Sequence, residues 1–281
     1  MTAAHAQKIR PITRPIAAFV EVTPRLAEEW LAGNTVNRKV RPDAVNQYAA
    51  DMIAGRWTIS ESAICFSPDG ELLNGQHRLR AVIQSGATIC MLVMRNVPIE
   101  SMSNMDAGRK RTTADALGFD GESSPHLLAA ATKLALLYTD GRLYRDRKVQ
   151  SVSTGELRDF LAAHPDLRYS IFSVSTVARP VDLTPTAKVV AHWIFTHAVS
   201  EDVADEFFEL LSTRVGLPEG SPILALDSRI RELRRSKSRI NHRSELHLLI
   251  KAWNHWRAGR AVRSLTLPNK AADAQLPAVA R

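Results

Sequence analysis

The chain changes character about two fifths of the way along its length, and this change constrains its fold more than any other feature. Before residue 112, short apolar runs typical of strands alternate with segments whose apolar residues recur at three- and four-residue spacing, as in helices. After it, only the helical spacing recurs. The sequence therefore predicts an α+β N-terminal domain over 16–111 and an all-α helical domain over 113–265. A Gly-, Ser-, Thr- and Asp-rich stretch at 112–124 is predicted to link them.

Within these domains, flanking prolines, glycines and capping residues set the expected element boundaries. The run 88–94 is apolar throughout, which is typical of a strand covered on both faces. Residues 1–15 and 268–281 are expected to form a flexible lead and a flexible tail. The predicted strands are 16–22, 63–66, 71–73 and 88–94. The predicted helices are 24–32, 42–54, 76–84, 125–138, 153–163, 167–178, 185–198, 201–214, 222–235 and 244–258.

Composition excludes several classes of protein. The 281 residues are 45% hydrophobic, which is enough for a packed core and excludes disorder of the whole chain. The only cysteines, Cys65 and Cys90, cannot form a disulfide framework or a four-cysteine zinc site, and we expect buried, reduced thiols. No apolar run approaches the ~18 residues of a transmembrane helix, and the chain starts without the apolar segment of a signal peptide. We expect a soluble, cytoplasmic protein without membrane contact.

The net charge of +8 comes from a single segment of the chain. Residues 229–263 contain eleven basic side chains and only two acidic ones, whereas the remainder is close to neutral. A localised basic excess is the pattern expected for a protein that binds a polyanion. The alternative is a solvated helix face that binds nothing. The residues predicted to contact DNA are Arg231, Arg234, Arg235, Lys237, Arg239 and Arg243.

The run LLNGQHRLRA at 72–81 has the pattern of a phosphate site, because it predicts a strand, a glycine turn and a helix start. Gly75 lets the backbone approach an anion closely. The first amides of the helix, at 76–78, have no partner within the helix and lie at the positive end of its dipole. Arg78 adds a planar fork that matches phosphate oxygens, and His77 can donate a hydrogen bond or transfer a proton. An ordinary polar helix start is the alternative.

This run resembles the signature of the ParB/sulfiredoxin fold. Sulfiredoxins carry Gly-Cys-His-Arg at this junction and bind ATP phosphates there, and chromosome-partition ParB proteins carry Gly-Glu-Arg-Arg and bind CTP. The present chain carries Gly75-Gln76-His77-Arg78. Asn37-Arg38, between the first two predicted helices, is similar to the Arg-bearing loop that supplies a second phosphate contact in these proteins.

The longer pattern is similar to that of bacteriophage proteins usually labelled ParB-like nuclease-domain proteins. It consists of Asn37-Arg38, Asp51-Met52 with Gly55-x-Trp57, Asn74 to Arg78, Asp106-x-Gly108-x-x-Arg111 and Ala252-Trp253-Asn254. The resemblance covers most of the chain and is most specific at the Gly-Gln-His-Arg junction. It implies a ParB/sulfiredoxin-like N-terminal domain, DNA as partner, a bound nucleotide and, for a phage-encoded protein, the cytoplasm of a bacterial host.

The chain also departs from these families. Gln76 stands where sulfiredoxins have their redox cysteine, which excludes sulfinic-acid reduction. His77 replaces a ParB arginine and Gln76 its acidic residue, so a CTP-switched clamp does not follow from the resemblance. Residues 113–265 contain no recognisable ParB-type helix-turn-helix signature.

The resemblance and the junction together define a predicted phosphate site. A nucleoside triphosphate there would be accompanied by Mg²⁺, which prefers oxygen ligands. If the chain is an enzyme, the predicted catalytic residues are His77, Arg78 and Asp106, which would stabilise charge and transfer a proton. The predicted nucleotide- or phosphate-binding residues are Asn37, Arg38, Asn74, Gly75, Gln76, His77, Arg78, Arg109 and Arg111.

Four acids are expected closest to this site, and each has a plain alternative. Asp51 fits a helix surface, and Asp69 and Glu71 fit turn chemistry. Asp106 is preferred because it precedes the basic run 109–111, which itself suits either a phosphate loop or a solvated hinge.

Histidines and tryptophans give weaker signals. His192 and His197, five residues apart, do not share a helix face, so we predict no metal ligands. Trp253 and Trp256 lie three apart on the last predicted helix and could stack on bases. Such pairs more often pack a helix against the hydrophobic core of its domain, and we favour this interpretation for Trp253.

The sequence leaves three functions open. The first is a DNA-associated ParB-like protein that binds a nucleotide or a backbone phosphate at the junction, with phosphoryl transfer or NTP hydrolysis. The second is a non-catalytic DNA-binding or regulatory module. The third is a ParB-like nuclease, which needs a metal site that the sequence does not assemble. The nucleotide, the acceptor, the preferred DNA sequence and homodimer formation stay open.

Overall fold

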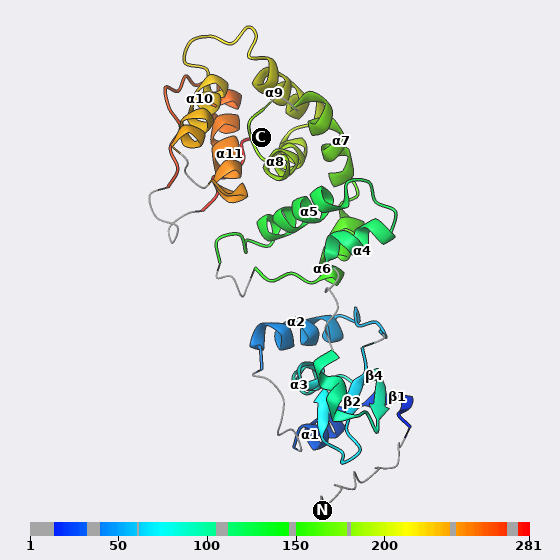
Figure 1. Ribbon diagram of the computed structural model, residues 1–281. Coiled ribbons are helices and arrows are strands. Elements are labelled where there is room, and N and C mark those ends of the chain that lie inside the picture. The colour runs from blue at the N-terminus through cyan, green and yellow to red at the C-terminus, as the bar shows by residue number, and fades with distance from the viewer. Residues whose placement is uncertain are drawn as a thin grey trace, which may run out of the picture. The chain divides into compact units, whose positions relative to one another are not determined.

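The computed structural model divides the chain into two compact units, residues 1–110 and 111–281 (Figure 1). Helices and one mixed sheet together make an α+β protein that is mostly helical. Among the described helices, none has both the length and the apolar character that a membrane crossing requires. The structure describes residues 14–32, 40–60, 62–104, 112–145, 150–178, 181–236, 240–268 and 275–281.

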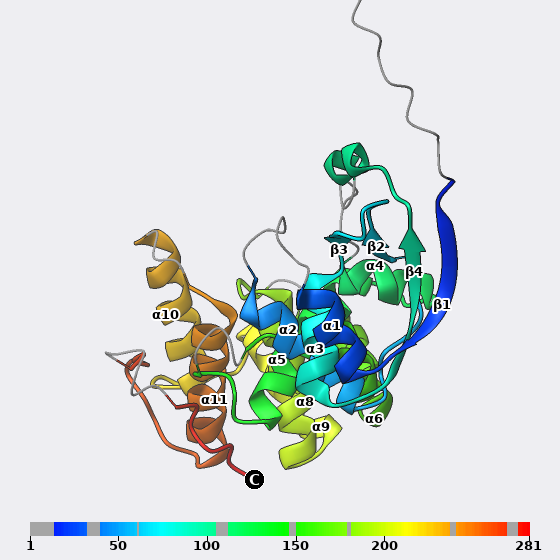
Figure 2. The same ribbon diagram turned by 90° about the horizontal axis from the view of Figure 1, so that it is seen from below.

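A mixed sheet is the framework of the N-terminal unit. Its described strands are β1 (Ile16–Val22), β2 (Ile64–Phe66), β3 (Leu72–Asn74) and β4 (Ile89–Arg95), arranged in the order β1-β4-β2-β3. β1 runs antiparallel to β4 along its whole length, as Figure 2 shows. β2 pairs parallel with β4 and antiparallel with β3, so the chain returns through a tight hairpin just before the predicted phosphate site.

Three helices cover one face of this sheet: α1 (Pro24–Ala32), α2 (Pro42–Ile53) and α3 (Gln76–Ser85). α3 packs against both α1 and α2. Helix and strand residues share one core, because Leu79 of α3 and Met91 of β4 belong to the same buried cluster. α1 begins as predicted, since the side-chain oxygen of Thr23 accepts a hydrogen bond from the amide of Leu26 at 3.2 Å.

The faces of β4 are buried unequally, which corrects the expectation of full cover on both sides. Met91 and Val93 are nearly inaccessible beneath the helices. Leu92 on the opposite face is only partly buried and packs on a much smaller cluster that includes Cys65. Cys65 is buried as expected, whereas Cys90 is half-buried, and both are free thiols.

The described part of the C-terminal unit consists of helices around a buried central helix, α8, which Figure 1 shows in the middle of the unit. Nine of the ten residues at 186–195 are 5% exposed or less. Because a helix that is apolar on every side must be surrounded, α5, α7, α9 and α11 all pack on it. The helices are α4 (Thr113–Phe119), α5 (Pro125–Thr139), α6 (Thr154–Ala163), α7 (Leu167–Val177), α8 (Pro185–Ala198), α9 (Glu201–Thr213), α10 (Pro222–Arg235) and α11 (His242–Arg257).

The predicted linker 112–124 contains helix α4, contrary to expectation. The hydroxyl of Thr112 accepts from the amide of Asp115 at 3.2 Å, and the Asp115 carboxylate accepts from the Thr112 amide at 2.7 Å. This is a capping box, so the Thr and Asp that suggested a linker are helix-start residues. A short 3₁₀ helix, η1 (Ile99–Asn104), was also not predicted.

The end of the chain corrects the predicted flexible tail, because residues 275–281 dock on α11. The indole Nε1 of Trp253 donates to the carbonyl of Ala280 at 2.9 Å. Asn254 donates to the carbonyl of Ala278 at 2.7 Å and accepts from the amide of Ala280 at 2.8 Å. Trp253 is fully buried and stacks on Phe195 with 4.2 Å between ring centroids, as the core interpretation predicts. The Ala-Trp-Asn segment therefore acts structurally in this chain.

Candidate functional site

The predicted strand, glycine turn and helix start are present at residues 72–78. β3 ends at Asn74, Gly75 has φ +113°, and α3 begins at Gln76. A Cβ on Gly75 would lie 2.3 Å from Cδ1 of Ile64, so the position has no space for a side chain. Gly75 caps α3 without a side-chain hydrogen bond, and the first turn of α3 contains no acidic residue. No acidic side chain in the first turn of α3 therefore offsets the positive end of the helix dipole.

His77 joins the starts of two helices. Its Nε2 accepts a hydrogen bond from the amide of Arg41, the N-cap residue of α2, at 3.0 Å. Because that nitrogen accepts, the neutral ring carries its proton on Nδ1. The N-termini of α2 and α3 therefore converge at this histidine. Asn37 and Arg38, predicted as the second phosphate contact, lie outside the described residues.

Arg78 binds the backbone of its own unit. Its two terminal nitrogens donate to the carbonyl oxygens of Ser62 and Ala63, the latter at 2.9 Å. These contacts fasten α3 to the segment that leads into β2. The pocket beside Arg78 measures about 10 Å³, about the space of one water, whereas small-molecule sites span a few hundred Å³. This pocket is therefore too small to hold a nucleotide.

The structure does not bring to this junction the three described acids that were predicted near it. Asp51 pairs with Arg56 at 2.9 Å, and ten helical residues place it about 15 Å along α2 from Arg41. Asp69 and Glu71 belong to the β2–β3 turn, at the end of β3 away from Gly75. None of these three carboxylates is therefore placed to bind Mg²⁺ at the start of α3, and the acid next to the converging helix starts is Asp43, in the first turn of α2. Asp106, Arg109 and Arg111 lie outside those ranges.

In the basic segment, Arg234 is the counter-ion of a buried carboxylate. Glu245 is fully buried, and its Oε1 accepts from Arg234 at 3.0 Å. Its other oxygen accepts from the amide of Thr184 at 3.2 Å and from the Thr184 hydroxyl. Lys188 is buried nearby, and desolvation lowers its pKa while Glu245 acts in the opposite sense. Removing Arg234 would take away the cation that hydrogen-bonds this buried carboxylate, so this arginine stabilises the fold.

Other predicted DNA contacts are also engaged within the chain. Arg231 pairs with Asp227 at 3.0 Å, and Arg243 donates to the carbonyl of Leu143 at 2.8 Å. Arg235, at the end of α10, is exposed and makes no ion pair within the described part of the chain. The ion pairs of Arg231 and Arg234 thus make the positive surface smaller than the count of basic residues indicates. Lys237 and Arg239 lie outside the described residues.

The C-terminal unit contains a Ser–His–Asp arrangement that was not predicted from the sequence. His192 Nδ1 lies 3.0 Å from the Ser170 hydroxyl, and its Nε2 lies 2.9 Å from Asp205 Oδ1. The atom types resemble a hydrolase triad, but His192 is inaccessible and Ser170 is only 2% exposed, so no substrate can reach them. Burial lowers the pKa of His192. The network links α7, α8 and α9. Its three residues come from different helices, so no local sequence pattern indicates that they meet.

No protein-family model, no curated protein and no solved structure matches this chain. Its function is therefore inferred from its own residues and their geometry.

Proposed function

We propose that this chain is a DNA-associated protein of the bacteriophage ParB-like type, whose N-terminal unit binds a phosphate group at the start of α3. The phosphate belongs to a nucleotide or to the DNA backbone. The observation that carries the proposal is the hydrogen bond between His77 and the amide of Arg41, which brings two helix N-termini together beside Gly75. Both helix ends carry positive partial charge, and anions bind at such ends.

The glycine turn supports the same ligand. Ile64 fills the space where a side chain at position 75 would lie, so the backbone itself forms the surface beside the helix start. Asp43 in the first turn of α2 offsets part of the positive field, whereas α3 has no acidic residue there. The start of α3 is therefore the more favourable end for an anion.

The proposal gives the C-terminal unit a non-specific DNA contact through its exposed basic side chains. Arg235 lies at the end of α10, and Arg257, Arg260 and Arg263 lie at and beyond the end of α11, all exposed. Such contacts release counter-ions from DNA, so binding should weaken with added salt. No catalytic step is part of the proposal, because the described acids predicted near the junction, Asp51, Asp69 and Glu71, lie away from it.

Binding of ATP, CTP, GTP and ADP with Mg²⁺ to the full chain tests the proposal, with a short DNA duplex as parallel ligand. His77→Ala should weaken phosphate binding about tenfold or more, equivalent to about 1.4 kcal/mol. Arg80→Ala is the matched control, because Arg80 is an exposed cation on the same helix. A second variant, Arg38→Ala, tests the predicted second contact without altering the His77–Arg41 hydrogen bond.

The outcomes separate the ligands. Loss of nucleotide binding in His77→Ala, with Arg80→Ala unchanged and both variants folded by circular dichroism, supports a nucleotide. If nucleotides do not bind but His77→Ala weakens DNA binding, the ligand is a backbone phosphate. If His77→Ala and Arg38→Ala bind both ligands as the wild type does, the proposal is wrong. Released or transferred phosphate would add a catalytic function.

A further inference from the structure

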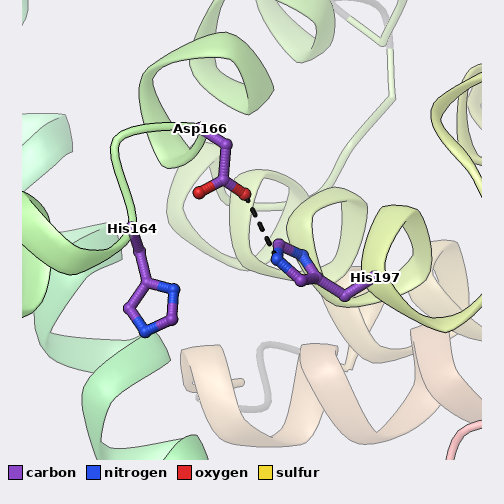
Figure 3. Close-up of side chains that lie close together, drawn as sticks. All are labelled: His164, Asp166 and His197. Carbon is purple, nitrogen blue, oxygen red and sulfur yellow. Dashed lines mark ion pairs between the residues drawn. The ribbon is translucent and has the colours of Figure 1, made fainter.

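Two histidines and an aspartate converge on the C-terminal unit, apart from every residue discussed above for phosphate or DNA (Figure 3). His164 follows the last residue of α6, and Asp166 precedes the first residue of α7. His197 lies in the last turn of α8. One ligand atom from each residue lies within 4.8 Å of the others, and His197 Nε2 is 3.4 Å from Asp166 Oδ2.

The ring of His197 is held in the orientation of a metal ligand. Its Nδ1 lies 2.9 Å from the carbonyl oxygen of Trp193. A carbonyl only accepts, so Nδ1 carries the proton and the neutral ring directs the lone pair of Nε2 toward Asp166. Two lone pairs then face each other, and a proton or a cation between them is needed for attraction. A ligating histidine typically donates its other N–H to a backbone carbonyl in this way.

We propose that His164, Asp166 and His197 bind a divalent transition-metal ion of the Zn²⁺ type. Tetrahedral ligands at about 2.0–2.1 Å from Zn²⁺ lie about 3.4 Å apart, which is the separation of the His197 and Asp166 ligand atoms. Two of the three ligands are imidazole nitrogens, which suit Zn²⁺ and its neighbours better than Mg²⁺ or Ca²⁺. One ring nitrogen of His164 lies within 4.8 Å of the other two ligand atoms and completes the set.

The surroundings support an ion with an open coordination position. The His164 ring packs against the rings of Phe160 and Trp193, with centroids 4.4 and 5.3 Å away. Both histidines line a pocket of about 260 Å³, to which the docked C-terminal segment contributes Arg281. Three protein ligands leave one position of a tetrahedral ion for water or a small ligand from this pocket.

An ordinary surface ion pair between His197 and Asp166 is the competing explanation. Both side chains are about half exposed, at 50% and 45%, and exposed pairs contribute little to stability. His164 distinguishes the two explanations, because it would be a ligand in the metal site and has no part in an ion pair between His197 and Asp166. The sequence predicted no metal ligand at His192 or His197, and the proposal departs from that prediction at His197 alone, since His192 is engaged with Ser170 and Asp205.

Metal titration of the full, tag-free chain tests the site. The protein is stripped with a chelator and titrated with Zn²⁺ in competition with a chromophoric chelator, and Co²⁺ then reports a tetrahedral site by its visible absorption. We expect one equivalent to bind. His164→Ala and His197→Ala should each weaken binding about 100-fold or more, since even loss of an outer-shell partner costs 10–100-fold. His126→Ala is the matched control, because His126 is an exposed histidine on α5.

Each result decides the matter. One equivalent lost in both ligand variants and kept in His126→Ala supports the site, provided that circular dichroism shows all variants folded. If His197→Ala unfolds, Asp166→Asn replaces it, because that change keeps both histidines. A wild-type chain that binds Zn²⁺ no more tightly than His164→Ala does would leave only the surface ion pair and overturn the proposal.

Discussion

Two regions of the chain contain arginines that the sequence predicts to contact phosphate: the start of α3, and the segment where α10 is followed by α11. The arginines of the two regions have different partners within the protein. Arg78 donates to two backbone carbonyls, whereas Arg234 pairs with the buried carboxylate of Glu245. Carbonyls fix a guanidinium without neutralising it, but a carboxylate cancels its charge. Basic residues in a sequence therefore overstate the positive surface wherever their partners are acids distant in the chain.

The difference also changes how each region should be tested. A variant at Arg234 perturbs the C-terminal fold before it perturbs any DNA contact, so loss of DNA binding in that variant says nothing about the interface. Arg235, the next residue, is exposed and offers a clean probe.

The largest expected effect is that of Arg234→Ala, which leaves the carboxylate of Glu245 buried without its counter-ion. Breaking a fully buried pair typically costs 3–5 kcal/mol. The Arg234 side chain is 39% exposed and Thr184 still donates to Glu245, so the expected loss is no more than the lower end, about 3 kcal/mol. Calorimetric or denaturant unfolding of the full chain measures it. Arg235→Ala should change stability by less than about 0.5 kcal/mol. If both changes lowered the free energy of unfolding equally, Arg234 would have no special role as the counter-ion of Glu245.

A second, smaller effect is expected at the other region. Gly75→Ala would place a Cβ 2.3 Å from Ile64 at a φ of +113°, so we expect a loss of about 2–3 kcal/mol from overpacking and backbone strain. Gly70→Ala is the matched control, because Gly70 also has positive φ but nothing within 4 Å of the added atom. Unfolding of both variants gives the difference. If Gly70→Ala is as destabilising, the tight approach to Ile64 has no special role.

The smallest effect is that of pH on the C-terminal unit. Burial lowers the folded-state pKa of His192 and His247, Lys251 lowers that of His247 further, and both unfolded values are ~6.5. Below that pH the unfolded chain takes up protons that the folded chain resists, so stability present above about pH 6.5 is lost on acidification. Each histidine contributes at most about 1.4 kcal/mol per pH unit. Unfolding midpoints between pH 7.5 and 5.5 should therefore fall.

His247→Leu separates the contribution of His247 to that pH dependence from the contribution of His192. Neither ring nitrogen of His247 has a hydrogen-bond partner among the described residues, so an apolar replacement loses no hydrogen bond and should flatten the profile. A wild-type profile already flat over this range, or one unchanged in His247→Leu, would contradict the assignment to this residue.

Periodicity and capping chemistry predicted most of the fold, because they act within a few residues. The strand of β1, the glycine that opens α3 and the capping box of Ser153 and Glu156 all follow from local pattern. α4 was missed because Thr and Asp serve both linkers and helix caps. The docked segment 275–281 was missed because its partners Trp253 and Asn254 lie more than twenty residues away.

The candidate sites were less predictable for the same reason. The glycine junction is a local motif, and it was located correctly. Two other features depend on which helices pack together: the Arg234–Glu245 pair and the convergence of His164 with His197. The spacing of residues along the sequence does not indicate which helices will pack together. His77 was predicted to face a ligand, but its contact with Arg41 required the packing of α2 on α3.

The close approach of Ile64 to Gly75 carries an evolutionary consequence. The isoleucine side chain stands where a side chain at position 75 would lie, and the φ of +113° strains any L residue there whatever the space. Position 75 therefore has two separate reasons to remain glycine. Descendants of this sequence should keep glycine at 75 even where a smaller residue replaces Ile64, because that replacement removes the clash and leaves the backbone strain.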